Sequence, residues 1–135
     1  MPVETHNAPS LPEPQGFTHV SVATGTRMVF LAGQVAQDEN GDLVGEGDLA
    51  AQTEQALVNV AACLELAGAT FADVAKTTMY VVDWEEPKLE QIVAGSMKAA
   101  ERLGGAALAP VTLIPVPRLF AEGHLIEIDT TAVLA

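Results

Sequence analysis

Residues 48–68 constrain the fold of this 135-residue chain more than any other stretch. Asp48 precedes a run in which apolar side chains recur with a 3.6-residue period, at Leu49, Ala56, Leu57, Val60, Leu64 and Ala67. Aspartate is a favoured residue just before a helix, and Gly68 supplies a C-terminal cap. The pattern predicts a helix with one apolar face, and that face must pack against another element.

Short β-branched runs surround this helix. "FTHVSVA" and "RMVFLAG", separated by "TGT", predict a hairpin, and "VAKTTMYVVDW" predicts a third strand. A second helix is expected from about Pro87 to Gly104, and two strands over about 111–119 and 124–133. With an extended leader at 1–16, the order ββαβαββ predicts one α+β domain over 1–135, with both helices on a mixed sheet.

Both faces of the predicted sheet are apolar. In "MVFLA" the side chains of Val29 and Leu31 point one way, and those of Met28, Phe30 and Ala32 point the other way. The run "MYVVDW" alternates in the same manner. Because two helices cover only one face of such a sheet, the other face is expected to meet a second subunit.

Charge narrows the range of partners. Eighteen acidic against six basic side chains give a formal charge of −12, which repels nucleic-acid backbones and anionic membranes. No apolar run is long enough to span a bilayer, and the leader is polar and proline-rich, so a cytoplasmic protein is expected. The single cysteine, Cys63, falls on the apolar period of the first helix and is interpreted as a small buried hydrophobe.

Four segments resemble, in order and spacing, the Rid family, also called YjgF-like. They are "FTHV", "FLAGQV", "GDLAAQTEQALVNVAACLELAGATFADVAKTTMYVVD" and "PRL…LIEID". The resemblance implies a chorismate-mutase-like fold and a homotrimer with a small-molecule cleft between neighbouring subunits. It also implies hydrolysis of reactive enamines and imines to a 2-keto acid and ammonia, without metal or cofactor. Some relatives have been described as endoribonucleases, which a charge of −12 disfavours.

Three positions of the implied cleft have lost polar groups. Val111 stands where the resemblance implies an arginine that pairs with the substrate's carboxylate. A carboxylate buried beside valine would lose that pairing, so a standard 2-imino acid deaminase is not expected. Leu113 replaces a cysteine, and Phe17 replaces a tyrosine while keeping its ring.

Another cation in place of the arginine is not favoured. Arg118 is seven positions from Val111, an odd separation that points it to the opposite face of a regular strand, and a structural role is expected. A bulge at Pro115 or Pro117 would re-aim it. Two further cations stay open if a neighbouring subunit presents them: Lys76 and Arg27.

Two residues of the implied cleft are retained. Gly33 matches a glycine whose backbone lines the cleft, and Glu127 matches a glutamate that positions water, so Glu127 is the candidate general acid or base. The alternative is that Glu127 is simply the solvated residue of an alternating strand. His19 either contacts the ligand or is structural. The asparagine that the resemblance implies on the second helix corresponds to Gln91 or Val93.

No metal site or nucleophilic triad is predicted. The remaining histidines, His6 and His124, lie in the leader and in a turn, and no histidine pair has metal-ligand spacing. Three hypotheses for function follow: a hydrolase of an imine, an enamine or a related metabolite, a metabolite-binding protein without turnover, and an acidic trimeric scaffold.

Overall fold

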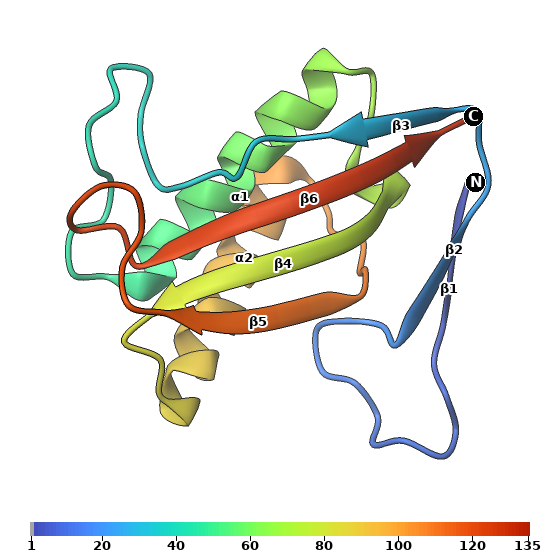
Figure 1. The fold of residues 1–135 in the computed structure, drawn as a ribbon, viewed down its shortest axis with the longest axis horizontal. Coiled ribbons are helices and arrows are strands. Elements are labelled where there is room, and N and C mark those ends of the chain that lie inside the picture. Colours follow the sequence, from blue (N-terminus) through green and yellow to red (C-terminus); the bar gives the residue numbers. More distant parts are fainter. Residues whose placement is uncertain (1) are drawn as a thin grey trace.

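The computed structural model describes residues 2–135. Figure 1 shows the ribbon. The elements in chain order are β1 (Val3–His6), β2 (Val20–Ala23), β3 (Arg27–Phe30), α1 (Leu49–Leu66), β4 (Val74–Val82), α2 (Leu89–Leu103), β5 (Val111–Val116) and β6 (Ile126–Leu134). Single turns of 3-10 helix, Phe71–Asp73 and Glu86–Lys88, precede β4 and α2.

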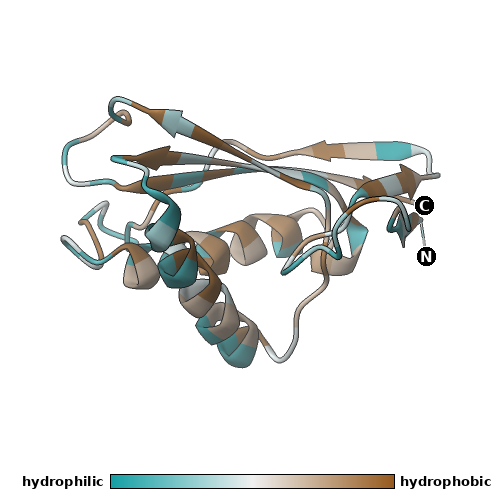
Figure 2. Cartoon of the chain, turned by 90° about the horizontal axis from the view of Figure 1, so that it is seen from below, coloured by the Kyte–Doolittle hydropathy of each residue, from teal (hydrophilic) through white to brown (hydrophobic). Residues whose placement is uncertain are grey.

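Strand β6 lies inside a four-stranded sheet of order β3-β6-β4-β5. It pairs antiparallel with β3 and β4, whereas β4 and β5 run parallel, so the sheet is mixed. Both helices lie on one side of this sheet (Figures 1 and 2). The predicted α+β class, with two helices on one face of a mixed sheet, is confirmed.

Strand β5 is at the edge of the sheet, where Pro115 costs no hydrogen bond between strands.

Both predicted helices are present. Asp48 caps α1, because its Oδ1 accepts a hydrogen bond of 3.0 Å from the backbone N–H of Ala51. Gly68 follows the helix in the left-handed conformation, with φ of 77°. The second helix begins with the 3-10 turn that contains Pro87 and ends at Gly104, whose φ is 78°. Local sequence signals therefore fixed these boundaries closely.

The two helices approach each other at Gly95 of α2. A Cβ atom added there would overlap the backbone oxygen of Ala50 and lie 2.8 Å from Cβ of Thr53. Both Gly95 and Thr53 are buried. This contact packs α2 against α1, and Ile92 of α2 shares one hydrophobic core with Ile126 and Ile128 of the sheet. Across residues 2–135, no helix is long and apolar enough to cross a membrane.

The predicted hairpin between "FTHVSVA" and "RMVFLAG" is wrong. Strand β2 pairs with β1, and β3 pairs with β6 instead. The turn passes so close to β6 that a Cβ on Gly25 would overlap the backbone oxygen of Leu134, and Thr26 N–H donates to the same oxygen at 3.0 Å. The chain thus crosses from one sheet to the other at this point.

The expected extended leader contains a short strand. Residues 3–6 form strand β1, so part of the segment 1–16 is regular structure, and its first residue lies outside the described residues. Figure 1 shows β1 and β2 as a separate two-stranded ribbon beside the main sheet. The strand order therefore begins with one more β element than the sequence pattern predicted.

The face of the sheet opposite the helices exposes large apolar side chains. Met28 is 62% exposed and Phe30 is 72% exposed, whereas Val29 packs against the core. The predicted alternation on β3 is thus confirmed. Figure 2 shows hydrophobic colour on the sheet layer as well as on the helices. Coverage of this face by other subunits stays a prediction.

Replacing Phe30 with glutamate tests that prediction. We expect the unchanged chain to have the mass of a trimer by light scattering, and the Phe30→Glu chain to have the mass of one chain, because a carboxylate in an apolar interface is left unpaired. The control is Leu66→Glu, since Leu66 is 92% exposed at the end of α1, away from this face. Equal masses for all three proteins would contradict the prediction.

Candidate functional site

Glu127 stands on the open face of the sheet. It lies on β6 between Ile126 and Ile128, which are both fully buried on the helix side, so the alternation of the strand turns the carboxylate outward. Its partner across the antiparallel pair with β4 is Tyr80. Glu127 is half-buried.

Gly33 lies directly against this carboxylate. A Cβ on Gly33 would overlap Oε2 of Glu127 and would lie 2.7 Å from its Cδ. The segment is held in place because Gln34 and Ile128 exchange two backbone hydrogen bonds, each of 2.9 Å. Any residue with a side chain at position 33 would displace the carboxylate. The structure therefore brings together the two residues that the resemblance implies are retained.

Gly33 and Glu127 line a hollow of about 370 Å³ on this face. The remaining lining residues come from β4, from β6 and from the segment after β5: Tyr80, Asp129, Arg118, Leu119 and Phe120. The hollow therefore contains two carboxylates, one phenol and one guanidinium. Sequence reasoning missed Tyr80 and Asp129, although both sit at alternating outward positions of strands β4 and β6.

Arg118 lines the hollow of Glu127, although a structural role was expected for it from its odd separation from Val111. Strand β5 stays in register with β4 up to Val116, paired with Val82, and Arg118 follows in the loop. Arg118 does lie on the face opposite Val111. Glu127 also faces away from Val111, so Arg118 and Glu127 share one face of the sheet. No bulge within β5 is needed to bring Arg118 to the hollow.

Val111 and Leu113 face the helices. Their partners on the parallel strand β4 are Thr77 and Met79, both buried, and they pack against the hydrophobic core. They line an apolar pocket of about 350 Å³ together with Phe17. The other lining residues come from the loops at Gln15–Gly16, Ala106 and Leu108 and from elements β4 and α2: Met79, Leu89, Ile92, Val93, Ser96, Met97 and Ala100.

The apolar pocket contains no charged side chain among the residues described as lining it. Of the two helix positions left open by the sequence, Val93 lines this pocket and Gln91 does not. Within one chain the predicted site residues are thus divided. Phe17, Val111 and Leu113 lie on the helix side of the sheet, and the hollow of Glu127 lies on the other.

His19 lines neither space. Its ring stands edge-on to Phe17, with 6.0 Å between ring centroids. Its Nδ1 accepts a hydrogen bond of 3.0 Å from Ala8 N–H, and its own backbone N–H donates to Oδ1 of Asn7. These contacts hold the leader against the residues before β2, which fits the structural alternative.

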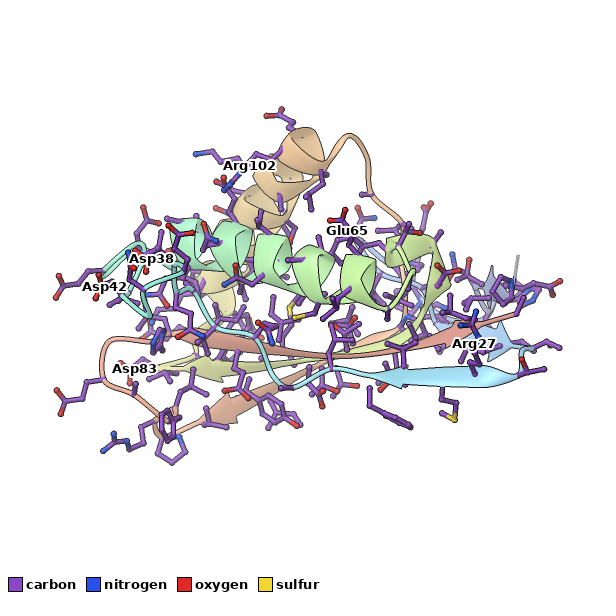
Figure 3. All side chains as sticks on the ribbon, turned by 90° about the horizontal axis from the view of Figure 1, so that it is seen from above. Arg27, Asp38, Asp42, Glu65, Asp83 and Arg102 are labelled. Carbon is purple, nitrogen blue, oxygen red and sulfur yellow. The ribbon has the colours of Figure 1, made fainter. Side chains whose placement is uncertain are left out.

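The other candidate groups are also placed. Lys76 donates a hydrogen bond of 2.7 Å to Oγ1 of Thr112, and Arg27 does not line the hollow. Cys63 is free and half-buried on α1. Figure 3 shows Asp38 and Asp42 together in the loop before α1. In residues 2–135, no group of three or more His, Cys, Asp or Glu side chains is arranged to hold a metal ion.

The fold is thus a mixed sheet with two helices on one side. On the other side is a hollow that contains two carboxylates and is large enough for a small ligand. The family model described as Endoribonuclease L-PSP matches residues 10–134. The chain belongs to this family, which also carries the Rid and YjgF names.

Individual relatives agree with this assignment. A RutC family protein of Pyrococcus horikoshii is 34% identical over 129 residues, which cover 95% of this chain and 93% of that protein. A 2-iminobutanoate/2-iminopropanoate deaminase of Salmonella typhimurium is 37% identical over 81 residues, covering 60% of this chain and 59% of the deaminase. The crystal structure of YyfB, a Rid protein of unknown function from Yersinia pestis, superposes with a TM-score of 0.87 at 37% identity, covering 99% and 100% of the two chains.

The contact between Gly33 and Glu127 can be measured with a double-mutant cycle. Gly33→Ala is expected to lower the free energy of unfolding by about 1 kcal/mol, because the new methyl group forces the glutamate out of its rotamer. In a chain that already carries Glu127→Ala, the same change should cost almost nothing. Urea denaturation of the four proteins gives the coupling energy. An equal cost of Gly33→Ala in both backgrounds would show that the clash does not involve Glu127.

Proposed function

We propose that this chain hydrolyses a small imine or enamine. An enamine first takes up a proton at its β-carbon to become the imine. Water then adds to the carbon of the C=N group, and a proton passes to the nitrogen. The C–N bond then breaks to leave a carbonyl compound and ammonia. The family assignment supports this reaction class, since a relative in the family is named as an imine deaminase.

The single observation that carries the proposal is the position of Glu127. Its carboxylate lies against the backbone of Gly33 and faces the hollow, where a water molecule and a small substrate have room. A carboxylate in this place accepts a proton from the attacking water and passes it to the leaving nitrogen. Gly33 contributes by being small, since any side chain there would fill the space of the carboxylate.

The working site in this proposal lies between subunits of a homotrimer. Phe17, Val111 and Leu113 are on the face opposite Glu127, so one chain cannot place all of them around the same ligand. The exposed apolar residues Met28 and Phe30 supply a surface on which chains would meet. Two surfaces from different chains would then enclose the substrate.

Val111 has no group that could pair with a carboxylate of the substrate. The pocket around it is apolar, and a carboxylate placed there would be left without a partner. We therefore propose that residue 111 does not bind an acid group of the substrate. Either it carries no carboxylate, or its carboxylate binds elsewhere in the site.

Replacing Glu127 with glutamine tests its catalytic role. Glu127→Gln keeps the shape but removes the proton acceptor, so hydrolysis should fall by about 100-fold or more. The measurement is ammonia release from imines made in place by an amino-acid oxidase or an amine oxidase, above the spontaneous rate. The control is Glu122→Gln, because Glu122 is exposed and does not line the hollow.

A binding function without turnover is the second candidate, and the apolar pocket favours it. About 350 Å³ lined by Phe17, Val111, Leu113 and apolar helix residues would hold a small apolar ligand. The same experiment separates the two functions. If the unchanged chain accelerates hydrolysis of no imine, while a ligand that copurifies with it binds equally well to Glu127→Gln, binding is the function.

Cleavage of RNA is not part of the proposal, although the family model carries an endoribonuclease name. A formal charge of −12 opposes binding to a phosphate backbone, and the six basic residues are scattered along the sequence. A scaffold role rests on the same charge alone. It would require a basic partner that copurifies at low salt and separates at high salt.

Placing an arginine at position 111 tests the role of the valine. Val111→Arg should raise the preference for 2-imino acids over uncharged imines, in kcat/KM, by about tenfold, because a guanidinium pairs with the carboxylate. Val111→Met is the apolar control of similar length. Thermal denaturation confirms that both variants fold. A folded Val111→Arg protein with unchanged preference would show that position 111 does not contact the substrate's acid group.

A further inference from the structure

Arg118 occupies a distinct place in the hollow of Glu127. It is the only basic side chain among the described residues that line this hollow, and it comes from the loop after β5. Glu127 and Asp129 lie two residues apart on β6, with outward-facing side chains. The hollow therefore has a positive pole on the loop and a negative pole on the strand.

The guanidinium of Arg118 is available to a ligand. Its Nε donates one long hydrogen bond of 3.3 Å to the backbone oxygen of Leu119. Among residues 2–135, no carboxylate lies within ion-pair distance of Arg118, whereas Arg102 pairs with Glu54 at 3.0 Å. Arginine has five N–H donors in a planar fork. The two terminal nitrogens of Arg118 thus remain free for a bidentate acceptor.

The charge of the chain makes this guanidinium selective. The chain carries a formal charge of −12 and the hollow contains two carboxylates, so among the residues that line the hollow only Arg118 attracts an anion. A planar carboxylate matches the fork of the guanidinium. A substrate with an acid group and an imine nitrogen would be oriented, since its acid group would face Arg118 and its nitrogen would face Glu127.

We propose that Arg118 is the specificity-determining residue that binds the substrate's carboxylate in the Glu127 hollow. This inference rests on the proposed hydrolysis and names its substrate class as imines or enamines of carboxylic acids. It answers where the acid group binds when Val111 cannot hold it. The resemblance implies an arginine at position 111, whereas the proposed anion site lies on the opposite face of the sheet, on the loop between β5 and β6.

The test uses the full chain and two probes of equal shape. Pyruvate carries the carboxylate and carbonyl that hydrolysis of a 2-imino acid would produce, and pyruvamide replaces the carboxylate with a neutral amide. Binding is measured by calorimetry or by NMR titration for the unchanged chain, Arg118→Gln, Arg118→Lys and Arg27→Gln. Arg27→Gln removes the same charge at an exposed position outside the hollow.

We expect Arg118→Gln to weaken pyruvate binding by about tenfold or more and to leave pyruvamide binding unchanged. Arg118→Lys should give an intermediate loss, because lysine keeps the charge but not the fork. Arg27→Gln should bind pyruvate as the unchanged chain does. In the hydrolysis assay, Arg118→Gln should raise KM for 2-imino acids more than it lowers kcat.

Three results would overturn the inference. The first is undetectable pyruvate binding by the unchanged chain, the second is an equal effect of Arg118→Gln and Arg27→Gln, and the third is equal weakening of pyruvate and pyruvamide. Failure of the proposed hydrolysis is a separate result. If no imine is turned over but pyruvate binding still depends on Arg118, the anion site stands and hydrolysis is rejected.

Discussion

The antiparallel pairing of β6 with both β3 and β4 is the constraint on which the structure depends. Its inward residues, Ile126 and Ile128, are fully buried against the helices. Its outward residues, Glu127 and Asp129, are thereby fixed on the opposite face. A shift of one residue in register would exchange the two sets and would bury both carboxylates. The same burial that holds the helices on the sheet therefore also positions the acid.

Helices were predictable from the sequence because their signals are local. The apolar period after Asp48, the cap at Gly68 and the first-turn Pro87 each act within a few residues. The hairpin failed because strand pairing is decided by distant segments. "TGT" permits a turn, but Gly25 lies against Leu134 at the far end of the chain, and that approach takes β3 to β6 instead of β2. Nothing within the turn itself reports this contact.

The candidate site was predictable residue by residue but not in its arrangement. The resemblance identified Gly33 and Glu127, which the structure places in contact. Strand alternation correctly predicted that Arg118 and Val111 lie on opposite faces of the sheet. Alternation orders residues only within one strand, however, and whether Glu127 on β6 shares a face with Val111 on β5 depends on how each pairs with β4. Val111 pairs with Thr77 of β4, and Glu127 pairs with Tyr80 of β4. Because Thr77 and Tyr80 are three positions apart on one strand, they point to opposite faces, and so do Val111 and Glu127.

The placement of the apolar pocket and the charged hollow on opposite sides of one sheet has a thermodynamic consequence. A molecule long enough to touch both surfaces must be shared by two copies of the chain. By mass action, each such molecule would then strengthen the association of the copies, and association would in turn raise affinity for the molecule. Ligand saturation and quaternary structure would rise and fall together, and dilution of the protein alone would release what it carries.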